Sequence, residues 1–161
     1  MAIMIPDIPK EFNIKSREGS MFEELNRLSD EYYVFHSFEI VTLKGNVITE
    51  SETDFVIFHP RKGLICLEAK AGQVKYEKGY WQYGSGVIMK HNGPYCQAKK
   101  NKWKLRDYMI SHGLEYESNN CKKIHAVWFP DVPLDNFNNV NLPGEGDINI
   151  TLTADAFGHI Q

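Results

Sequence analysis

The sequence predicts an α/β domain in which a central mixed β-sheet is flanked by helices. Two helical segments, residues 16–28 and 95–111, are separated by strand-like segments rich in aromatic and β-branched residues. A further apolar strand, residues 124–129, follows the second helix. The 161 residues suffice for one domain with its own core, and the 42% hydrophobic and 24% charged content is ordinary for a globular protein.

Composition excludes several classes of protein. No apolar run reaches the roughly 18–20 residues that span a membrane, and the start lacks the basic-then-apolar order of a signal peptide. The three cysteines, Cys66, Cys96 and Cys121, have no metal-binding spacing, which favours reduced thiols and a cytoplasmic location. The net charge of −3 is not that of a passive nucleic-acid binder, so any nucleic-acid contact must come from a local patch.

The N-terminal region divides into an arm and a helix. Residues 1–15 contain two prolines and no periodicity, which predicts an extended arm preceding a single domain over residues 16–161. Ser16 can cap the helix, whose apolar stripe consists of Met21, Phe22, Leu25 and Leu28.

Acidic residues on this helix fall into two groups. Glu18 extends the apolar stripe toward the helix start, where an acid either only favours the helix dipole or belongs to a site. Glu23 and Glu24 lie off the stripe and are expected to be solvated.

Strands follow at residues 32–43 and 48–58, with turn residues at 44–46 between them. The second of these strands enters a hairpin whose predicted loop is residues 59–63, so that Phe58 pairs with Leu64.

The same register places Asp54 opposite Glu68, and Lys70 projects on the same face. The other face carries Phe55, Ile57, Ile65, Leu67 and Ala69 and is expected to be buried.

Charge gives this hairpin a candidate function. Two adjacent carboxylates raise one another's pKa unless a cation neutralises them, and Mg²⁺ prefers such oxygen ligands. Lys70 could then hold a water molecule or stabilise charge on a phosphate oxygen. The alternative is a surface hairpin with solvated charges, because short Asp…Glu-x-Lys matches are frequent by chance.

The second helix is closed by Gly113 and is the densest basic segment of the chain. Such a helix either has a solvated face or contacts phosphates. The residues predicted to bind nucleic acid are Lys99, Lys100, Lys102 and Lys104.

The remaining segments are shorter. Residues 74–76 and 80–83 suggest a small antiparallel excursion, 131–146 a loop, and 148–152 a final edge strand. Residues 154–161 resemble the beginning of a helix, which suggests a fragment of a longer protein. His36, His59, His91 and His125 are scattered; His36 is expected to be structural, and zinc is disfavoured.

Several landmarks occur in a characteristic order: an acid on the first helix, an aspartate on a central strand, Glu-x-Lys on the next strand, and a glutamine opening a later helix. This order resembles the PD-(D/E)xK nuclease superfamily, and more closely its nuclease-related domain, NERD. The resemblance spans most of the chain and includes Tyr33-Val34-Phe35-His36-Ser37, Thr53-Asp54-Phe55-Val56, Leu67-Glu68-Ala69-Lys70, Trp81 and Pro94-Tyr95-Cys96-Gln97.

The resemblance implies a restriction-endonuclease-like core and a Mg²⁺- or Mn²⁺-dependent nuclease that cleaves DNA with a metal-activated water. Asp54, Glu68 and the Ala69 carbonyl would ligate the metal, and Lys70 would position or activate the water. Glu18 would help to bind or orient the metal, and Gln97 would contact its water shell or a phosphate. The family also implies fusion to helicase or kinase modules.

Two departures from the family pattern stand out. Thr53 occupies the position of the superfamily's proline, and Asn101 stands where related nucleases often have a tyrosine four residues after the glutamine. Two other functions stay open: a non-catalytic nucleic-acid-binding module that serves a fused enzyme, and a protein-interaction domain with a vestigial site.

Overall fold

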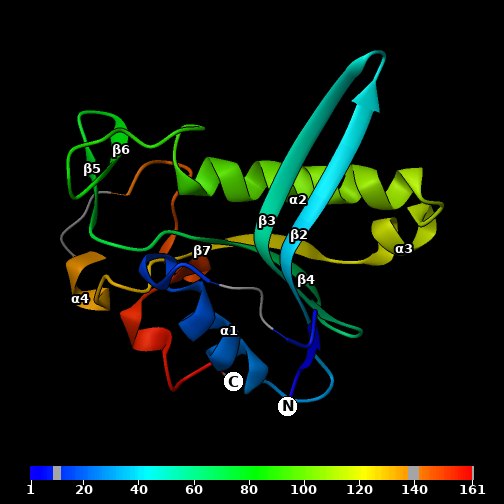
Figure 1. Ribbon diagram of the computed structural model, residues 1–161, viewed down its shortest axis with the longest axis horizontal. Coiled ribbons are helices and arrows are strands. Elements are labelled where there is room, and N and C mark those ends of the chain that lie inside the picture. The colour runs from blue at the N-terminus through cyan, green and yellow to red at the C-terminus, as the bar shows by residue number, and fades with distance from the viewer. Residues whose placement is uncertain (9–11, 138–141, 161) are drawn as a thin grey trace.

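The computed structural model describes residues 1–8, 12–137 and 142–160. Its centre is a six-stranded sheet in the order β1-β2-β3-β4-β7-β8, and β5 and β6 form a separate two-stranded sheet (Figure 1). The strands are β1 (Ile3–Ile5), β2 (Tyr33–Lys44), β3 (Val47–His59), β4 (Gly63–Ala69), β5 (Val74–Glu77), β6 (Tyr80–Tyr83), β7 (Lys123–Trp128) and β8 (Thr151–Leu152). The helices are α1 (Glu18–Asn26), α2 (Pro94–Ser111), α3 (Glu115–Asn120) and α4 (Leu134–Phe137), with short 3₁₀ turns η1 (Ile14–Ser16), η2 (Ile148–Ile150) and η3 (Ala154–Ala156).

The sheet is mixed, as the sequence predicts. β2, β3 and β4 form an antiparallel meander, β1 runs parallel to β2, and β7 and β8 run parallel to β4. The connection from β4 to β7 contains β5, β6, α2 and α3. Parallel neighbours need a long crossover of this kind, which here brings α2 onto the sheet.

The two main helices cover opposite faces of the sheet (Figure 1). On one face, α1 packs Met21, Phe22 and Leu25 against a cluster that includes Phe55 and Leu67. The predicted buried layer of the hairpin, residues 55, 57, 65, 67 and 69, lies in this cluster. On the other face, α2 packs through Leu105 against a second apolar cluster containing Ile40, Val56, Leu64 and Cys66.

β2 and β3 continue past the sheet as a two-stranded arm (Figure 1). The arm begins where Ser37 adopts a left-handed backbone with φ of +51°, within an otherwise extended strand. Near its base Ile40 is buried in the α2 cluster, whereas Val41, Leu43, Val47 and Ile48 are exposed.

The small β5–β6 sheet fixes the start of α2. The buried Trp81 of β6 lies against Gly93, the residue before the helix. Gly93 has φ of +94°, and a Cβ atom there would lie 2.2 Å from Trp81 Cδ1. Only glycine meets both conditions, so Gly93 lets the indole pack directly beneath the helix start.

The N-terminal prediction was partly wrong. Residues 3–5 of the expected arm form β1, because their backbone pairs with β2 and this pairing needs no side-chain periodicity. Residues 9–11 of that arm lie outside the described part of the chain. The helix begins at Glu18, after a left-handed Arg17, and Glu24, expected to be solvated, is buried and bonded to Arg27 and to the Gly158 N–H.

The hairpin loop is shorter than predicted. His59 pairs with Gly63, so only residues 60–62 form the loop. His59 is buried, and its Nδ1 accepts a hydrogen bond from the Arg61 N–H at 3.1 Å. The imidazole thus closes the turn, which extends the ladder by one pair.

The C-terminal part also differs from expectation. Within the predicted loop 131–146, residues Leu134–Phe137 form α4, and residues 138–141 lie outside the described chain. The predicted edge strand 148–152 is mostly the turn η2, and only Thr151–Leu152 pairs with β7. α3 was missed because its six polar residues give no apolar stripe.

In the described ranges, no helix is long and apolar enough to cross a membrane.

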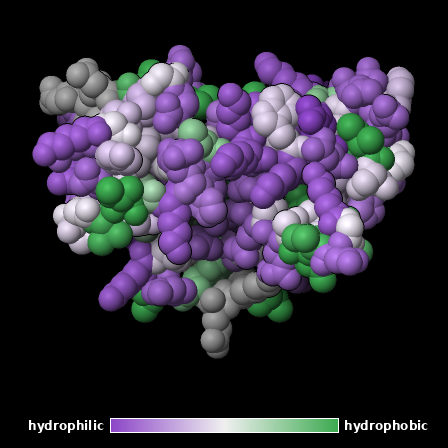
Figure 2. Space-filling model, turned by 90° about the horizontal axis from the view of Figure 1, so that it is seen from above, coloured by the Kyte–Doolittle hydropathy of each residue, from purple (hydrophilic) through white to green (hydrophobic). Residues whose placement is uncertain are grey.

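The face seen from above the arm is covered in its middle by hydrophilic side chains, with hydrophobic ones scattered toward its margins (Figure 2). Single exposed apolar residues of this kind are normal on a protein surface.

Candidate metal-dependent nuclease site

The hairpin of β3 and β4 brings Asp54 and Glu68 together. The predicted pairs Val56–Cys66 and Phe58–Leu64 are both formed, but the ladder ends at Phe55–Leu67, one pair short of Asp54 and Glu68. Instead, the Asp54 side chain takes the place of its backbone: Oδ2 accepts a hydrogen bond of 2.8 Å from the Ala69 N–H. Its carboxylate is therefore held against β4 beside Glu68.

Glu68 and Lys70 form an ion pair at the end of β4. Glu68 Oε1 lies 3.0 Å from Lys70 Nζ, and the two side chains lie on the same side of the strand as Cys66. Glu68 is only 2% exposed, and its Oε2 is buried without a hydrogen-bond partner in the described part of the chain. A buried, unsatisfied carboxylate oxygen is costly and calls for a donor or a cation.

Burial and crowding of negative charge raise the pKa values of both acids. Burial is the main cause for Asp54, whose pKa is well above its usual range, followed by the charge of Glu68. Burial also raises the pKa of Glu68, and the charges of Glu18 and Glu52 add to this, while Lys70 opposes it. A cation bound between the two carboxylates would stabilise their ionised forms and lower both pKa values.

Lys70 stays protonated in this setting. Burial alone would lower its pKa, but the charge and hydrogen bond of Glu68 outweigh that effect and the pKa is raised. Tyr83 of β6, which the sequence did not single out, lies close enough to raise it further. Lys70 is thus a cation that can orient a water or a phosphate oxygen, rather than a proton acceptor.

The residues at this position fit a divalent cation such as Mg²⁺. The donors are carboxylate oxygens, one of which is buried without a hydrogen-bond partner in the part of the chain that the structure describes. Mg²⁺ is usually held by one or two carboxylates while keeping several waters. Among the residues that the structure describes, no three His, Cys, Asp or Glu side chains converge to hold a metal. The fit therefore concerns Asp54 and Glu68.

Glu18 lies near this pair of acids. Its charge acts on both Asp54 and Glu68, yet its Oε2 lies 3.0 Å from Nε2 of His36. The sequence suggested a structural role for His36 and gave no sign of this contact, which joins α1 to β2.

Gln97 lies in the first turn of α2 and is half-buried. Its neighbour Ala98 packs in one cluster with Val127, which is the register partner of Glu68 on β7. One turn later the buried Asn101 donates a hydrogen bond of 3.1 Å to the Glu52 carbonyl. At the position of the family's tyrosine, this side chain anchors α2 to β3 just before Asp54.

The lysines of α2 do not share one environment. Lys99, Lys100 and Lys104 are exposed. Lys102 is only 9% exposed, and its Nζ lies 4.4 Å from the centroid of the Trp103 ring. Burial and the charge of Lys99 lower the pKa of Lys102, so burial argues against the predicted phosphate contact there.

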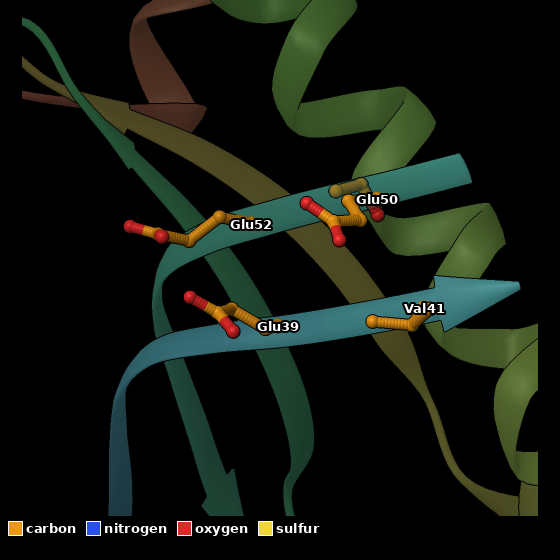
Figure 3. A pocket seen from close by; sticks show the side chains of 5 residues that line it. Glu39, Val41, Glu50 and Glu52 are labelled. Carbon is orange, nitrogen blue, oxygen red and sulfur yellow. The ribbon is translucent and has the colours of Figure 1, made fainter. Parts of the chain in front are cut away.

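A shallow pocket on the arm has the opposite charge. Glu39, Glu50 and Glu52 line it together with Val41 and Ser51 (Figure 3). Because Glu39 pairs with Glu52 and Val41 with Glu50, these side chains lie on one face of the arm. The acidic side chains make that face repel anions.

Comparison with known families agrees with this geometry. The model of the nuclease-related domain, NERD, matches residues 15–130, which is well over half of the chain. The chain belongs to the NERD family. The match begins just before α1 and ends just after β7, so the NERD region contains Glu18, Asp54, Glu68, Lys70 and Gln97. No curated protein and no solved structure matches the chain.

Proposed function

We propose that this NERD protein hydrolyses phosphodiester bonds of DNA with Mg²⁺ or Mn²⁺. The observation that carries the proposal is the buried Oε2 of Glu68, which has no hydrogen-bond partner among the described residues. It lies next to Asp54, and Lys70 Nζ is 3.0 Å from the other oxygen of Glu68. A bound divalent cation would supply charge neutralisation and a lowered pKa of water.

Each residue of the site has its own proposed role. Asp54 and Glu68 hold the cation, with the Ala69 carbonyl as a further oxygen donor. Lys70, which is protonated, orients the attacking water and stabilises charge on the phosphate. Gln97, in the first turn of α2, would contact a phosphate or the water around the cation.

The exposed lysines of α2 bind the nucleic-acid backbone in this proposal. Lys99, Lys100 and Lys104 supply the local positive charge that the net charge of −3 does not. Lys102 contributes least, because it is buried against Trp103.

The test is a cleavage assay with linear, circular and single-stranded DNA in the presence of Mn²⁺. We expect wild-type protein to cleave at least one substrate and Asp54→Ala and Lys70→Ala to lose at least a hundredfold in rate. Lys75→Ala is the matched control, because Lys75 is exposed and, within the described residues, forms an ion pair with Glu77 alone. Cleavage that survives in both site variants would defeat the proposal.

A second function is favoured by one observation: the described residues offer no three-acid metal cluster, while α2 presents exposed lysines. In this alternative the chain binds nucleic acid and guides a fused helicase or kinase. It predicts salt-sensitive DNA binding without metal and no cleavage products in the same assay.

A further inference from the structure

His36 is a buried histidine enclosed by aromatic rings. It is 4% exposed on β2, and its ring centroid lies 4.6 Å from that of Phe12, 5.1 Å from Phe55 and 6.1 Å from Phe22. Rings on three sides, from the N-terminal segment, β3 and α1, leave the imidazole little freedom to rotate.

The hydrogen bonds of this ring identify which nitrogen carries the proton. Nε2 lies 3.0 Å from Oε2 of Glu18 and 3.1 Å from Oγ of Ser37, whereas Nδ1 is buried without a partner in the described chain. A proton on Nδ1 would be a buried donor with no acceptor, which is unfavourable. With the proton on Nε2, the ring donates a hydrogen bond to Glu18.

The position of His36 in β2 relates this contact to the metal site. The pairs His36–Phe55 and Phe38–Thr53 place Ser37 opposite Asp54. Ser37 has φ of +51°, a left-handed conformation that a serine in a strand keeps only when its surroundings enforce it. The imidazole that bonds Glu18 is therefore one residue from the backbone that faces Asp54.

We infer that His36 is a positioning residue, whose Nε2–H holds the Glu18 carboxylate beside Asp54 and Glu68. The inference rests on the proposed function, because the held carboxylate matters through its charge and hydrogen bonds near a bound cation. Glu18 is itself 24% exposed at its side chain, so without His36 it could turn toward solvent. Partners that orient acids around a metal are often worth a large factor in affinity.

If His36 only fills space, its replacement by other residues should have different effects from those expected for a positioning residue. His36→Gln keeps an N–H donor near the position of Nε2, whereas His36→Leu fills similar volume without a donor. A pure packing role treats the two replacements alike, and a positioning role separates them.

The experiment is calorimetric titration with Mn²⁺ of wild type, His36→Gln, His36→Leu, Glu18→Gln and the His36→Leu/Glu18→Gln double variant. We expect His36→Leu and Glu18→Gln each to weaken Mn²⁺ binding by about 10-fold, in line with other residues that orient metal ligands. His36→Gln should stay within about 3-fold of wild type, and the double variant should be no weaker than Glu18→Gln, because His36 acts through Glu18. Thermal melts check that each variant is folded.

Two outcomes would overturn the inference. One is His36→Leu binding Mn²⁺ as wild type does; the other is His36→Leu weakening binding by the same factor whether or not Glu18 is present. A third readout needs no metal: the ¹⁵N shifts of the His36 ring should report the proton on Nε2, and a proton on Nδ1 would also overturn it.

If the proposed function itself is wrong, the titration gives a different result. Wild-type protein that binds no Mn²⁺ would overturn the metal site and with it the positioning role, even with the proton on Nε2. The hydrogen bond to Glu18 would then be only a packing contact between α1 and β2.

Discussion

At the scale of single residues, the site concentrates acids where burial makes their charge expensive. Asp54 and Glu68 both have raised pKa values, because Asp54 is largely and Glu68 fully shielded from solvent, and each faces further negative charge. Only Lys70 and the Ala69 N–H oppose this. Without a cation, the protein therefore carries a cost in stability at the residues that would bind one.

The raised pKa of Asp54 predicts that Asp54→Asn stabilises the metal-free protein at neutral pH. The folded state keeps a proton that the unfolded chain has already released, so the free energy of unfolding falls as pH rises from below the usual pKa of 3.8 through the raised value. Asparagine does not titrate, so the free energy of unfolding of Asp54→Asn does not fall in this way. Its side-chain oxygen can still accept the hydrogen bond from the Ala69 N–H. We expect Asp54→Asn to be more stable than wild type at pH 7 and to unfold at a higher Tm.

The measurement is urea unfolding in EDTA at pH 4 and pH 7. The stability difference between Asp54→Asn and wild type should be larger at pH 7, and Asp30→Asn, at an exposed position, should show no such trend. A difference that is equal at both pH values, or that favours wild type at pH 7, contradicts the assignment of a raised pKa.

At the scale of elements, only the base of the β2–β3 arm contributes to the described hydrophobic core. The arm holds its base in the core through Ile40, and its outer part exposes Val41, Leu43, Val47 and Ile48. Since buried area supplies most of the stability, the outer arm should be dispensable for folding.

Replacing residues 42–49 with Asn-Gly should leave the fold intact. Val41 and Glu50 form a register pair, so a two-residue type I′ turn can join them directly. We expect Tm to change by less than about 4 °C, because only exposed residues are lost. A circular-dichroism melt measures this, and loss of cooperative unfolding would show that the arm supports the core.

The exposed lysines of α2 predict the salt dependence of DNA binding. Replacing Lys99, Lys100 and Lys104 with alanine should weaken binding and lower the slope of log K against log salt by about 2–3, since each phosphate contact contributes about 0.9. Fluorescence anisotropy at several salt concentrations measures the slope. Lys44→Ala, at the exposed arm tip, is the control, and an unchanged slope in the triple variant would remove α2 from the interface.

At the scale of the whole molecule, the site lies in a fold of three layers. α1, on one face of the sheet, contributes Glu18, and the hairpin of β3 and β4 contributes Asp54, Glu68 and Lys70. α2 covers the other face and begins at Pro94. The acidic face of the arm adds a negative field that attracts cations and repels phosphates.

Binding of Mg²⁺ or Mn²⁺ should therefore stabilise the entire domain. A ligand at 100 times its Kd adds about 2.7 kcal/mol to the free energy of unfolding, which predicts a rise in Tm of about 5–11 °C for a chain of this length. Differential scanning fluorimetry with and without EDTA measures the rise, and Glu68→Gln should reduce it strongly. An equal rise in that variant would place the cation elsewhere.

The relative positions of the candidate site residues on the hairpin could be predicted from the sequence because they depend on local spacing. The hairpin register follows from strand alternation, so Asp54, Glu68 and Lys70 could be assigned to one face, and the structure pairs Val56 with Cys66 as expected. The mixed sheet and both main helices follow from apolar periodicity in the same way. What failed was local structure without such a pattern: β1, α3, α4 and the turn η2.

The amino-acid sequence by itself therefore determined the sheet, its two covering helices and the acids and lysine of the hairpin, because periodicity and strand pairing are encoded within a few residues of each other. Only the tertiary structure decided that His36 bonds Glu18, that Asn101 anchors α2 to β3, and that Lys102 is buried. Each of these depends on which side chains from distant elements meet, and burial then sets their proton positions, charge and accessibility.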